Sequence, residues 1–145
     1  MRQAFVSTVE IRAANAVDLN AVDGIQRSCP EASHWNVADY LDREFRVALV
    51  DDCIRGFLVF RDVASDEREI LNLAVAPESR RKGIASALLE SCLKGFQGAV
   101  FLELRASNKA AERFYKLHKF QEVSRRPQYY ESPPETAIVM KFHSC

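Results

Sequence analysis

The strongest constraint on the fold of this chain is an apolar segment that ends at a proline and leads through a basic loop into a helix. Residues 70–75 are apolar on both faces apart from Asn72, as is typical of a strand at the centre of a covered sheet. Pro77 ends that strand, because proline donates no backbone hydrogen bond. Ile84 and Leu88 then begin a run of apolar residues at helical spacing. This order predicts an α/β protein.

The loop between this strand and this helix favours the binding of a phosphate group. A helix N-terminus presents unpaired backbone N–H groups and a partial positive charge. Gly83 and Ala85 carry little or no side chain, so an anion can approach the backbone closely. Arg80, Arg81 and Lys82 add charged donors. The same residues would also suit a helix entry with a solvated basic cluster. The spacing differs from GxxxxGK[ST] and GxGxxG, which disfavours P-loop nucleotides and dinucleotides.

The rest of the chain alternates between strand and helix patterns. We expect further strands over residues 5–12, 45–50, 54–63, 100–104, 120–123 and 137–142. We expect helices from a cap at Asn15 or Asp18 to near Pro30, and over residues 36–42, 84–93 and 108–118. The fold class is therefore α/β, with a mixed central sheet of six to seven strands and helices on both faces.

Two details of this scheme concern the second half of the chain. The helix over 108–118 is expected to turn Ala111, Phe114 and Leu117 inward. A polar loop is expected between the last two strands, and it contains Pro127, Pro133 and Pro134.

Composition narrows the class of protein. A chain of 145 residues fits a single domain over residues 1–145. The 20 basic and 20 acidic residues balance, so no overall field attracts nucleic acid or a membrane surface. The cysteines form no CxxC pair, which argues against a metal or redox site; they are Cys29, Cys53, Cys92 and Cys145. We expect a cytoplasmic protein, since the sequence shows neither a signal peptide nor an apolar run long enough to span a membrane.

The stretch Arg80-x-x-Gly83-x-Ala85 resembles motif A of the GNAT superfamily of N-acetyltransferases, [Q/R]-x-x-G-x-[G/A]. The resemblance implies the GNAT (acyl-CoA N-acyltransferase) fold and acetyl-CoA as co-substrate, without a metal. In that family the strand before the motif splays from its neighbour and pairs with the pantetheine arm, here through Leu73, Ala74 and Val75. The loop and helix start hold the phosphates, and the matching residues are Arg80, Arg81, Lys82, Gly83, Ile84, Ala85 and Ser86.

A second block covers residues 101–115, with Arg126-Pro127-Gln128-Tyr129-Tyr130 after it. It is similar to the LEVRxSNxxAxxxY and RxxYY blocks of the RimI type, the ribosomal-protein-alanine N-acetyltransferases. The resemblance implies that Glu103 takes a proton from the attacking ammonium, that Tyr115 protonates the departing CoA thiolate, and that Asn108 touches the cofactor. Trp35, Tyr129 and Tyr130 would line the acceptor cleft.

Each of these residues also has a structural interpretation. Glu103 could form an ion pair with Arg105, which lies on the same strand face. Tyr115 could be a half-buried tyrosine packed beside Phe114, and Asn108 is a good helix cap. Aromatic packing would account for the three acceptor candidates equally well.

One departure from the family and several alternatives remain open at this stage. The family has Leu-Gly-Phe after the helix, where this chain has His118-Lys119-Phe120. A lysine in the left-handed conformation would cost about 1 kcal/mol. The implied reaction is direct acetyl transfer in a ternary complex to the N-terminal α-amine of a small-subunit ribosomal protein, by a monomer or a dimer. The alternatives are transfer to a small-molecule amine or lysine, a non-catalytic acyl-CoA-binding module, and nucleic-acid binding.

Overall fold

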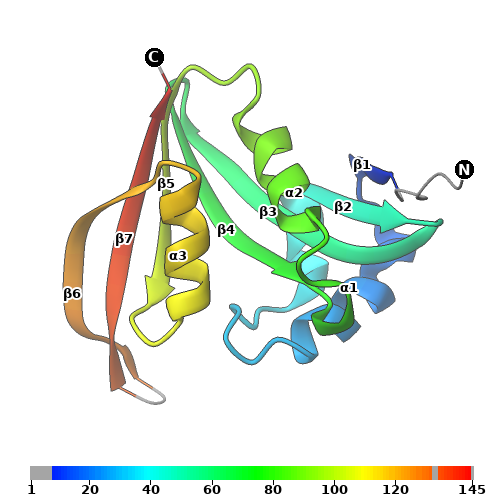
Figure 1. The fold of residues 1–145 in the computed structure, drawn as a ribbon, viewed down its shortest axis with the longest axis horizontal. Coiled ribbons are helices and arrows are strands. Elements are labelled where there is room, and N and C mark those ends of the chain that lie inside the picture. Colours follow the sequence, from blue (N-terminus) through cyan, green and yellow to red (C-terminus); the bar gives the residue numbers. More distant parts are fainter. Residues whose placement is uncertain (1–7, 132–133, 145) are drawn as a thin grey trace, which may run out of the picture. The chain divides into compact units, whose positions relative to one another are not determined.

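The computed structural model describes residues 8–131 and 134–144 and contains a mixed seven-stranded sheet with the order β1-β2-β3-β4-β5-β7-β6 (Figure 1). The strands are β1 (Val9–Ala13), β2 (Glu44–Val50), β3 (Cys53–Ala64), β4 (Glu67–Val75), β5 (Gly98–Arg105), β6 (Gln121–Glu131) and β7 (Pro134–Ser144). The helices are η1 (Ala16–Asp18), α1 (Leu19–Arg27), η2 (Val37–Asp42), η3 (Pro77–Ser79), α2 (Ile84–Leu93) and α3 (Lys109–Leu117). The predicted α/β class and mixed sheet are confirmed.

The chain divides into two compact units. Unit 1 comprises the described residues up to Val59 together with Asn72–Cys92. Unit 2 comprises Phe60–Leu71 and the described residues from Leu93 onward. The boundaries fall inside β3 and β4, so each of these strands contributes residues to both units.

Unit 1 has helices on both faces of its strands. An added Cβ on Gly56 of β3 would lie 3.1 Å from Leu88 Cδ1 and 3.2 Å from Ile84 Cγ2, so α2 packs directly on this face. The next residue, Phe57, points to the opposite face, where its ring centroid lies 5.9 Å from that of Tyr40 in η2. The hydroxyl of Tyr40 in turn donates to Gln26 of α1. The predicted covering of both faces is therefore confirmed within this unit.

The start of the chain and the first hairpin in unit 1 follow the sequence signals. Asn15 caps η1, and its side chain accepts from the backbone N–H of Val17 while Asp18 accepts from the backbone N–H of Asn15. The turn between β2 and β3 has positive φ at both Asp51 and Asp52, 51° and 64°, as in the type I′ turns that suit hairpins. The predicted strand residues 5–7 lie outside the described part of the chain.

Unit 2 contains parallel and antiparallel pairs. β4 pairs in parallel with β5 from Glu67↔Ala99 to Glu69↔Phe101, and β5 pairs antiparallel with β7. Gly98, at the start of β5, has a φ of 150°, and a Cβ there would lie 2.2 Å from the carbonyl oxygen of Asp66. Only glycine fits this close backbone approach.

Two expectations about unit 2 are wrong. Strand β6 continues through Pro127 to Glu131 instead of giving way to a polar loop. An edge strand tolerates proline, and β6 has register shifts between Glu122 and Ser124 and between Arg126 and Tyr130. Leu117 is 83% exposed rather than inward, whereas Glu112 and Tyr115 are the buried residues of α3. Pro133 lies outside the described residues.

Candidate active site

The loop that leads into α2 has a backbone suited to an anion. Arg81 and Gly83 have positive φ angles of 65° and 79°, and Lys82 between them does not. Backbone N–H groups of successive residues with alternating handedness converge into a concavity that binds anions. The first turn of α2 adds N–H groups without intrahelical partners. A Cβ on Gly83 would meet no atom within 4 Å, so space beside the loop is open to a ligand.

The end of β4 carries the residues for which the resemblance implies pantetheine contacts. Leu73 is partly exposed, while Ala74 and Val75 are buried. The carbonyl oxygen of Val75 accepts from the Cys29 thiol and from Arg80 Nε, each at 3.4 Å. Within unit 2, β4 pairs with β5 from Glu67↔Ala99 to Glu69↔Phe101.

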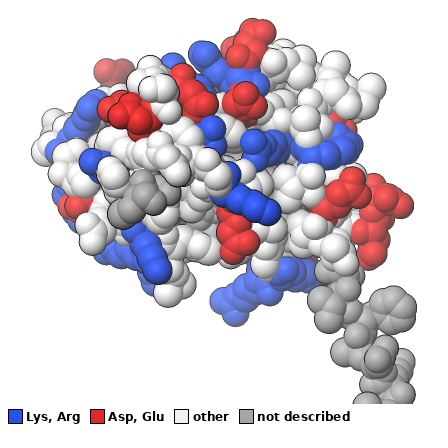
Figure 2. Space-filling view, turned by 90° about the horizontal axis from the view of Figure 1, so that it is seen from above, with Lys and Arg blue, Asp and Glu red and all other residues white. Residues whose placement is uncertain are grey.

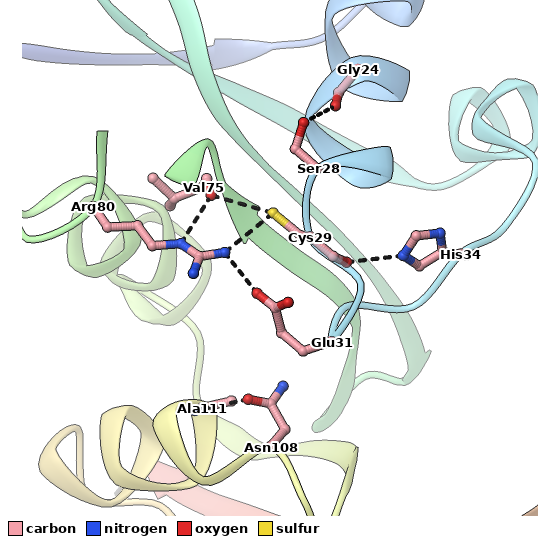
Figure 3. A network of polar contacts seen from close by, with 9 residues as sticks. All are labelled: Gly24, Ser28, Cys29, Glu31, His34, Val75, Arg80, Asn108 and Ala111. Carbon is pink, nitrogen blue, oxygen red and sulfur yellow. Dashed lines mark hydrogen bonds and ion pairs between the residues drawn. The ribbon is translucent and has the colours of Figure 1, made fainter. Parts of the chain in front are cut away.

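Arg80, the first residue of the motif, points its guanidinium toward the segment that follows α1 (Figure 3). Its Nη2 donates to Glu31 Oε1 at 2.6 Å and to Cys29 Sγ at 3.4 Å. Cys29 is 1% exposed, and burial raises the pKa of its thiol while the Arg80 guanidinium opposes that change. The sequence predicted a phosphate ligand at Arg80; in the structure its partly exposed side chain bonds Glu31 and Cys29 of the same chain.

Glu103 lies on β5 in unit 2, with 28% of its side chain exposed. Its Oε1 is 3.6 Å from Nη1 of Arg126 on β6. Arg105, the ion-pair partner considered from the sequence, instead bonds Glu135 Oε2 at 3.2 Å and stacks on Tyr130 with its Cζ 4.3 Å from the ring centroid. The sequence suggested an ion pair of Glu103 with Arg105 as the structural role of Glu103; in the structure its ion-pair partner is Arg126.

Tyr115 is 7% exposed and lies in the last turn of α3. The N–H of Phe120 donates to the carbonyl of Tyr115 at 2.9 Å, and the N–H of Lys119 donates to that of Lys116 at 3.0 Å. This is the bond pattern of a Schellman motif, and the rings of Tyr115 and Phe120 lie 5.3 Å apart. Lys119 has a φ of 70°, so it takes the left-handed position that glycine has in the family.

Asn108 begins α3 as its N-cap. Its Oδ1 accepts from the backbone N–H of Ala111 at 3.2 Å (Figure 3). Next to the helix start, Glu135 accepts from the backbone N–H of Ser107 at 2.6 Å. Hydrogen bonds from the side chain and from the backbone N–H of Ser107 lower the pKa of Glu135, and the Arg105 guanidinium adds to the effect. The capping role predicted for Asn108 is confirmed.

The three acceptor candidates are divided between the units. Trp35 lies in unit 1 and is 49% exposed. Tyr129 and Tyr130 lie in unit 2 on β6, with their ring centroids 5.4 Å apart, and Arg126 lies over the Tyr129 ring at 5.2 Å. Burial raises the pKa of Tyr130, and the nearby charge of Glu103 adds to the effect.

Sequence reasoning missed a buried polar network in unit 1. Asn72 Nδ2 donates to the carbonyl of Ser33 at 2.8 Å, to the Tyr40 hydroxyl at 3.1 Å and to Gln26 Oε1 at 3.2 Å. Gln26 Nε2 donates to the carbonyl of Trp35 at 2.7 Å. The signal was visible in Asn72, which is the polar exception in an apolar strand, but its partners lie 32 to 46 positions away.

Three further observations bear on the class of protein. Among the described residues no group of three or more His, Cys, Asp or Glu side chains is arranged to hold a metal ion. The described cysteines Cys29, Cys53 and Cys92 form no disulfide, and Cys145 lies outside the described residues. In the described part of the chain, every helix is too short or too polar to cross a membrane.

Comparison with known proteins gives consistent results. Residues 16–120 match the Acetyltransferase (GNAT) family. A ribosomal protein bS18-alanine N-acetyltransferase from Escherichia coli strain K12 is 37% identical over 84 residues, 54% of this chain and 57% of that protein. The chain thus matches less than two-thirds of the length of this curated relative.

Two further relatives match more of the chain. An N-alpha-acetyltransferase from Saccharolobus solfataricus is 31% identical over 113 residues, 67% of this chain and 68% of that protein. The crystal structure of Ard1 from Thermoplasma volcanium has a TM-score of 0.84 and 27% identity, and the match covers 94% of this chain and 98% of that one. By the family match, by these relatives and by its fold, the chain belongs to the GNAT family of acetyltransferases.

Proposed function

We propose that this protein transfers the acetyl group of acetyl-CoA to an amine, and that the amine is the N-terminal α-amine of a protein. The observation that carries the proposal is the loop before α2, in which Arg81 and Gly83 have positive φ and basic side chains flank an open space. Such a concavity at a helix N-terminus suits a pyrophosphate. Arg81, Lys82, Gly83, Ile84, Ala85 and Ser86 hold the phosphates, with Arg80 at the head of the loop.

The remaining parts of acetyl-CoA follow the family pattern. Leu73, Ala74 and Val75 contact the pantetheine arm, and Asn108 contacts the cofactor as well as capping α3. The pairing of β4 with β5 runs only from Glu67↔Ala99 to Glu69↔Phe101 and supports this arrangement, because a strand edge without a hydrogen-bonding partner has backbone groups available to a ligand.

The proposed reaction is direct transfer in a ternary complex. Glu103 accepts a proton from the ammonium, since an ammonium has no lone pair with which to attack. The free amine nitrogen then bonds to the thioester carbonyl carbon, the carbon–sulfur bond breaks, and Tyr115 gives its proton to the CoA thiolate. The nitrogen releases its second proton to water as the amide forms, and Tyr115 regains a proton from solvent. Both residues lie in unit 2, and the proposal for Tyr115 is supported by the Schellman turn, in which the N–H of Phe120 donates to the Tyr115 carbonyl.

The acceptor is proposed from its chemistry and from the relatives. An α-amine has an unperturbed pKa of about 7.7–8.0 against about 10.4 for lysine, so a weak base suffices to free it. The E. coli relative is named as an alanine N-acetyltransferase of ribosomal protein bS18. We place this protein in the cytoplasm, acting on a small-subunit ribosomal protein as a monomer or dimer. Basic and acidic side chains are interspersed on the face in Figure 2, which disfavours nucleic-acid binding.

The test is an acceptor panel followed by mass spectrometry. Purified protein and acetyl-CoA are incubated with alanine-initiated ribosomal peptides, the same peptides with blocked N-termini, lysine peptides and polyamines. We expect acetylation of free N-termini only. Transfer to polyamines or lysine would refute the α-amine assignment, and binding of acetyl-CoA without any transfer would favour a binding module.

Two variants test the proposed catalytic residues. Glu103→Gln and Tyr115→Phe should each lower kcat by about 10²–10⁴-fold. Glu122→Gln is the matched control, because Glu122 is a carboxylate on β6 that pairs with Arg125 at 2.8 Å and has no assigned role. Equal losses in the control and in Glu103→Gln would refute the assignment of Glu103.

A further inference from the structure

The segment over residues 28–36, between α1 and η2, is attached to the body of unit 1 at two places; we call it the 28–36 loop. It carries Trp35, the chain's single tryptophan and a candidate for acceptor contact. Arg80, from the loop that follows β4, makes the first attachment, and Asn72 of β4 makes the second together with Gln26 of α1. The proposed function places acetyl-CoA at the end of β4 and in the loop that follows it.

The first attachment is the guanidinium of Arg80. It lies against the start of the 28–36 loop (Figure 3), where Nη2 bonds Glu31 Oε1 at 2.6 Å and Cys29 Sγ at 3.4 Å. Nε of the same group donates to the carbonyl of Val75 at the end of β4. A hydrogen bond within the loop joins His34 to Cys29, with 2.9 Å between His34 Nε2 and the carbonyl oxygen of Cys29. One side chain thus joins β4, the buried thiol and the loop carboxylate.

The second attachment is the buried network around Asn72. Asn72 holds the carbonyl of Ser33, and Gln26 holds the carbonyl of Trp35 at 2.7 Å. Asn72 and Gln26 are 6% and 3% exposed, so their hydrogen bonds are made away from water, where an unmade bond is costly. The backbone of the loop is therefore held at two carbonyls.

We propose that Arg80, through Glu31, is a positioning residue for the acceptor: it pins the 28–36 loop, and so Trp35, to the end of β4. The proposal rests on the proposed function for the identity of the acceptor. It adds a role for the motif's first residue besides that of a phosphate ligand. Loss of the Arg80–Glu31 ion pair should therefore raise the KM of the peptide acceptor even when the Kd of acetyl-CoA is unchanged.

The exposure of this ion pair makes the proposal testable without unfolding the protein. The side chains of Arg80 and Glu31 are 47% and 38% exposed, and exposed pairs add little to overall stability. Glu31→Ala and Arg80→Ala should therefore fold. Glu78→Ala is the matched control, because it removes an exposed carboxylate, paired with Arg55 at 3.8 Å, close to Arg80 in sequence but outside the pin.

The first readout is independent of activity. Acrylamide quenching of Trp35 fluorescence, measured without ligand, should increase in Glu31→Ala and in Arg80→Ala and stay at the wild-type value in Glu78→Ala. Hydrogen exchange of amides 28–36 should be faster in the same two variants. Unchanged quenching and exchange in both variants would overturn the pin, whether or not the protein proves to be an acetyltransferase.

The second readout is kinetic. Glu31→Ala should raise the KM of an N-terminal peptide acceptor by about fivefold, while the Kd of acetyl-CoA and kcat stay within about twofold of wild type. A variant that combines Glu31→Ala with Arg80→Ala should have the same peptide KM as Arg80→Ala alone, because the two side chains act through one ion pair. A loosened Trp35 with an unchanged peptide KM would overturn the role in acceptor positioning.

Discussion

At the scale of single residues, Lys119 shows how a departure from a family pattern is accommodated. The residue adopts a φ of 70° and makes the Schellman bond to Lys116 at 3.0 Å. The turn is therefore kept, and the strain of the left-handed conformation falls on lysine. Tyr115 remains bonded through its carbonyl to Phe120, so the departure does not displace the proposed acid from its turn.

This strain predicts that Lys119→Gly stabilises the protein. Glycine has no Cβ to clash in the left-handed region. The relief of this strain should outweigh the greater entropy that glycine gives the unfolded chain, for a net stabilisation of about 0.5–1 kcal/mol. Urea denaturation would measure the free energy of unfolding. Lys119→Ala is the control, because alanine keeps the Cβ; an equal gain from alanine would show that left-handed strain is not the cause.

Asp18 predicts a pH dependence of stability. The bidentate bonds from Arg12, at 2.8 and 2.9 Å, and the bond from the backbone N–H of Asn15 lower its pKa. A lowered folded pKa means that this stabilisation is present above the ordinary Asp pKa of about 3.9 and is lost as the pH falls through the folded value. Asp18→Asn should cost about 1.5–3 kcal/mol at pH 7.

The difference between wild type and Asp18→Asn should shrink as the pH falls below about 3.9, as measured by urea denaturation across a pH series. Asp23→Asn is the control. Asp23 forms an i,i+4 pair with Arg27, whose side chain is 78% exposed, and such pairs contribute about 0.3–0.5 kcal/mol. A constant difference for Asp18→Asn down to low pH would contradict the linkage.

At the scale of elements, the packing of α2 on β3 depends on Gly56. A Cβ there would lie 3.0 Å from the carbonyl oxygen of Ala74 as well as close to Ile84 and Leu88. Gly56→Ala should therefore push α2 from the strand and destabilise the protein by about 1–3 kcal/mol. Thermal denaturation by circular dichroism checks this expectation.

Gly24 provides the opposite case on a helix. It is an exposed residue of α1, and a Cβ there would meet no atom within 4 Å. Gly24→Ala should stabilise the protein by about 0.5–1 kcal/mol, since glycine is a poor helix former. If Gly56→Ala and Gly24→Ala changed the stability in the same direction, steric contact of the added Cβ at Gly56 would not explain the effect of Gly56→Ala.

Elements are also where sequence and structure agree and differ most clearly. The proline after β4, the Asp51-Asp52 turn and the Asn15 and Asn108 caps act on neighbouring residues, and each of them could be predicted. The course of β6 through Pro127 could not, because it depends on pairing with β7 and on the edge position of the strand.

At the scale of the whole molecule, the two units share β3 and β4. The boundaries at Val59 and Leu71 fall within strands, so the chain passes from one unit to the other without leaving a strand. We therefore predict that the chain behaves as a single domain and unfolds in one cooperative transition.

Probes confined to each unit can check this prediction. Trp35 fluorescence reports on unit 1, and hydrogen exchange of β6 and β7 reports on unit 2. Their urea midpoints should coincide with each other and with that of far-UV circular dichroism. Two separate midpoints would show that the units are independent domains.

The sequence by itself determined the fold class, the order of most elements and the family. These follow from hydrophobic period, caps, turns and one short motif, all of which act between residues close in the chain. Tertiary structure alone decided the partners of the charged and polar side chains: Arg80 with Glu31, 49 positions away, Glu103 with Arg126 rather than with Arg105, and Asn72 with Ser33. The physical reason is that such pairs depend on which distant segments packing brings within about 3 Å, and no local period encodes that distance.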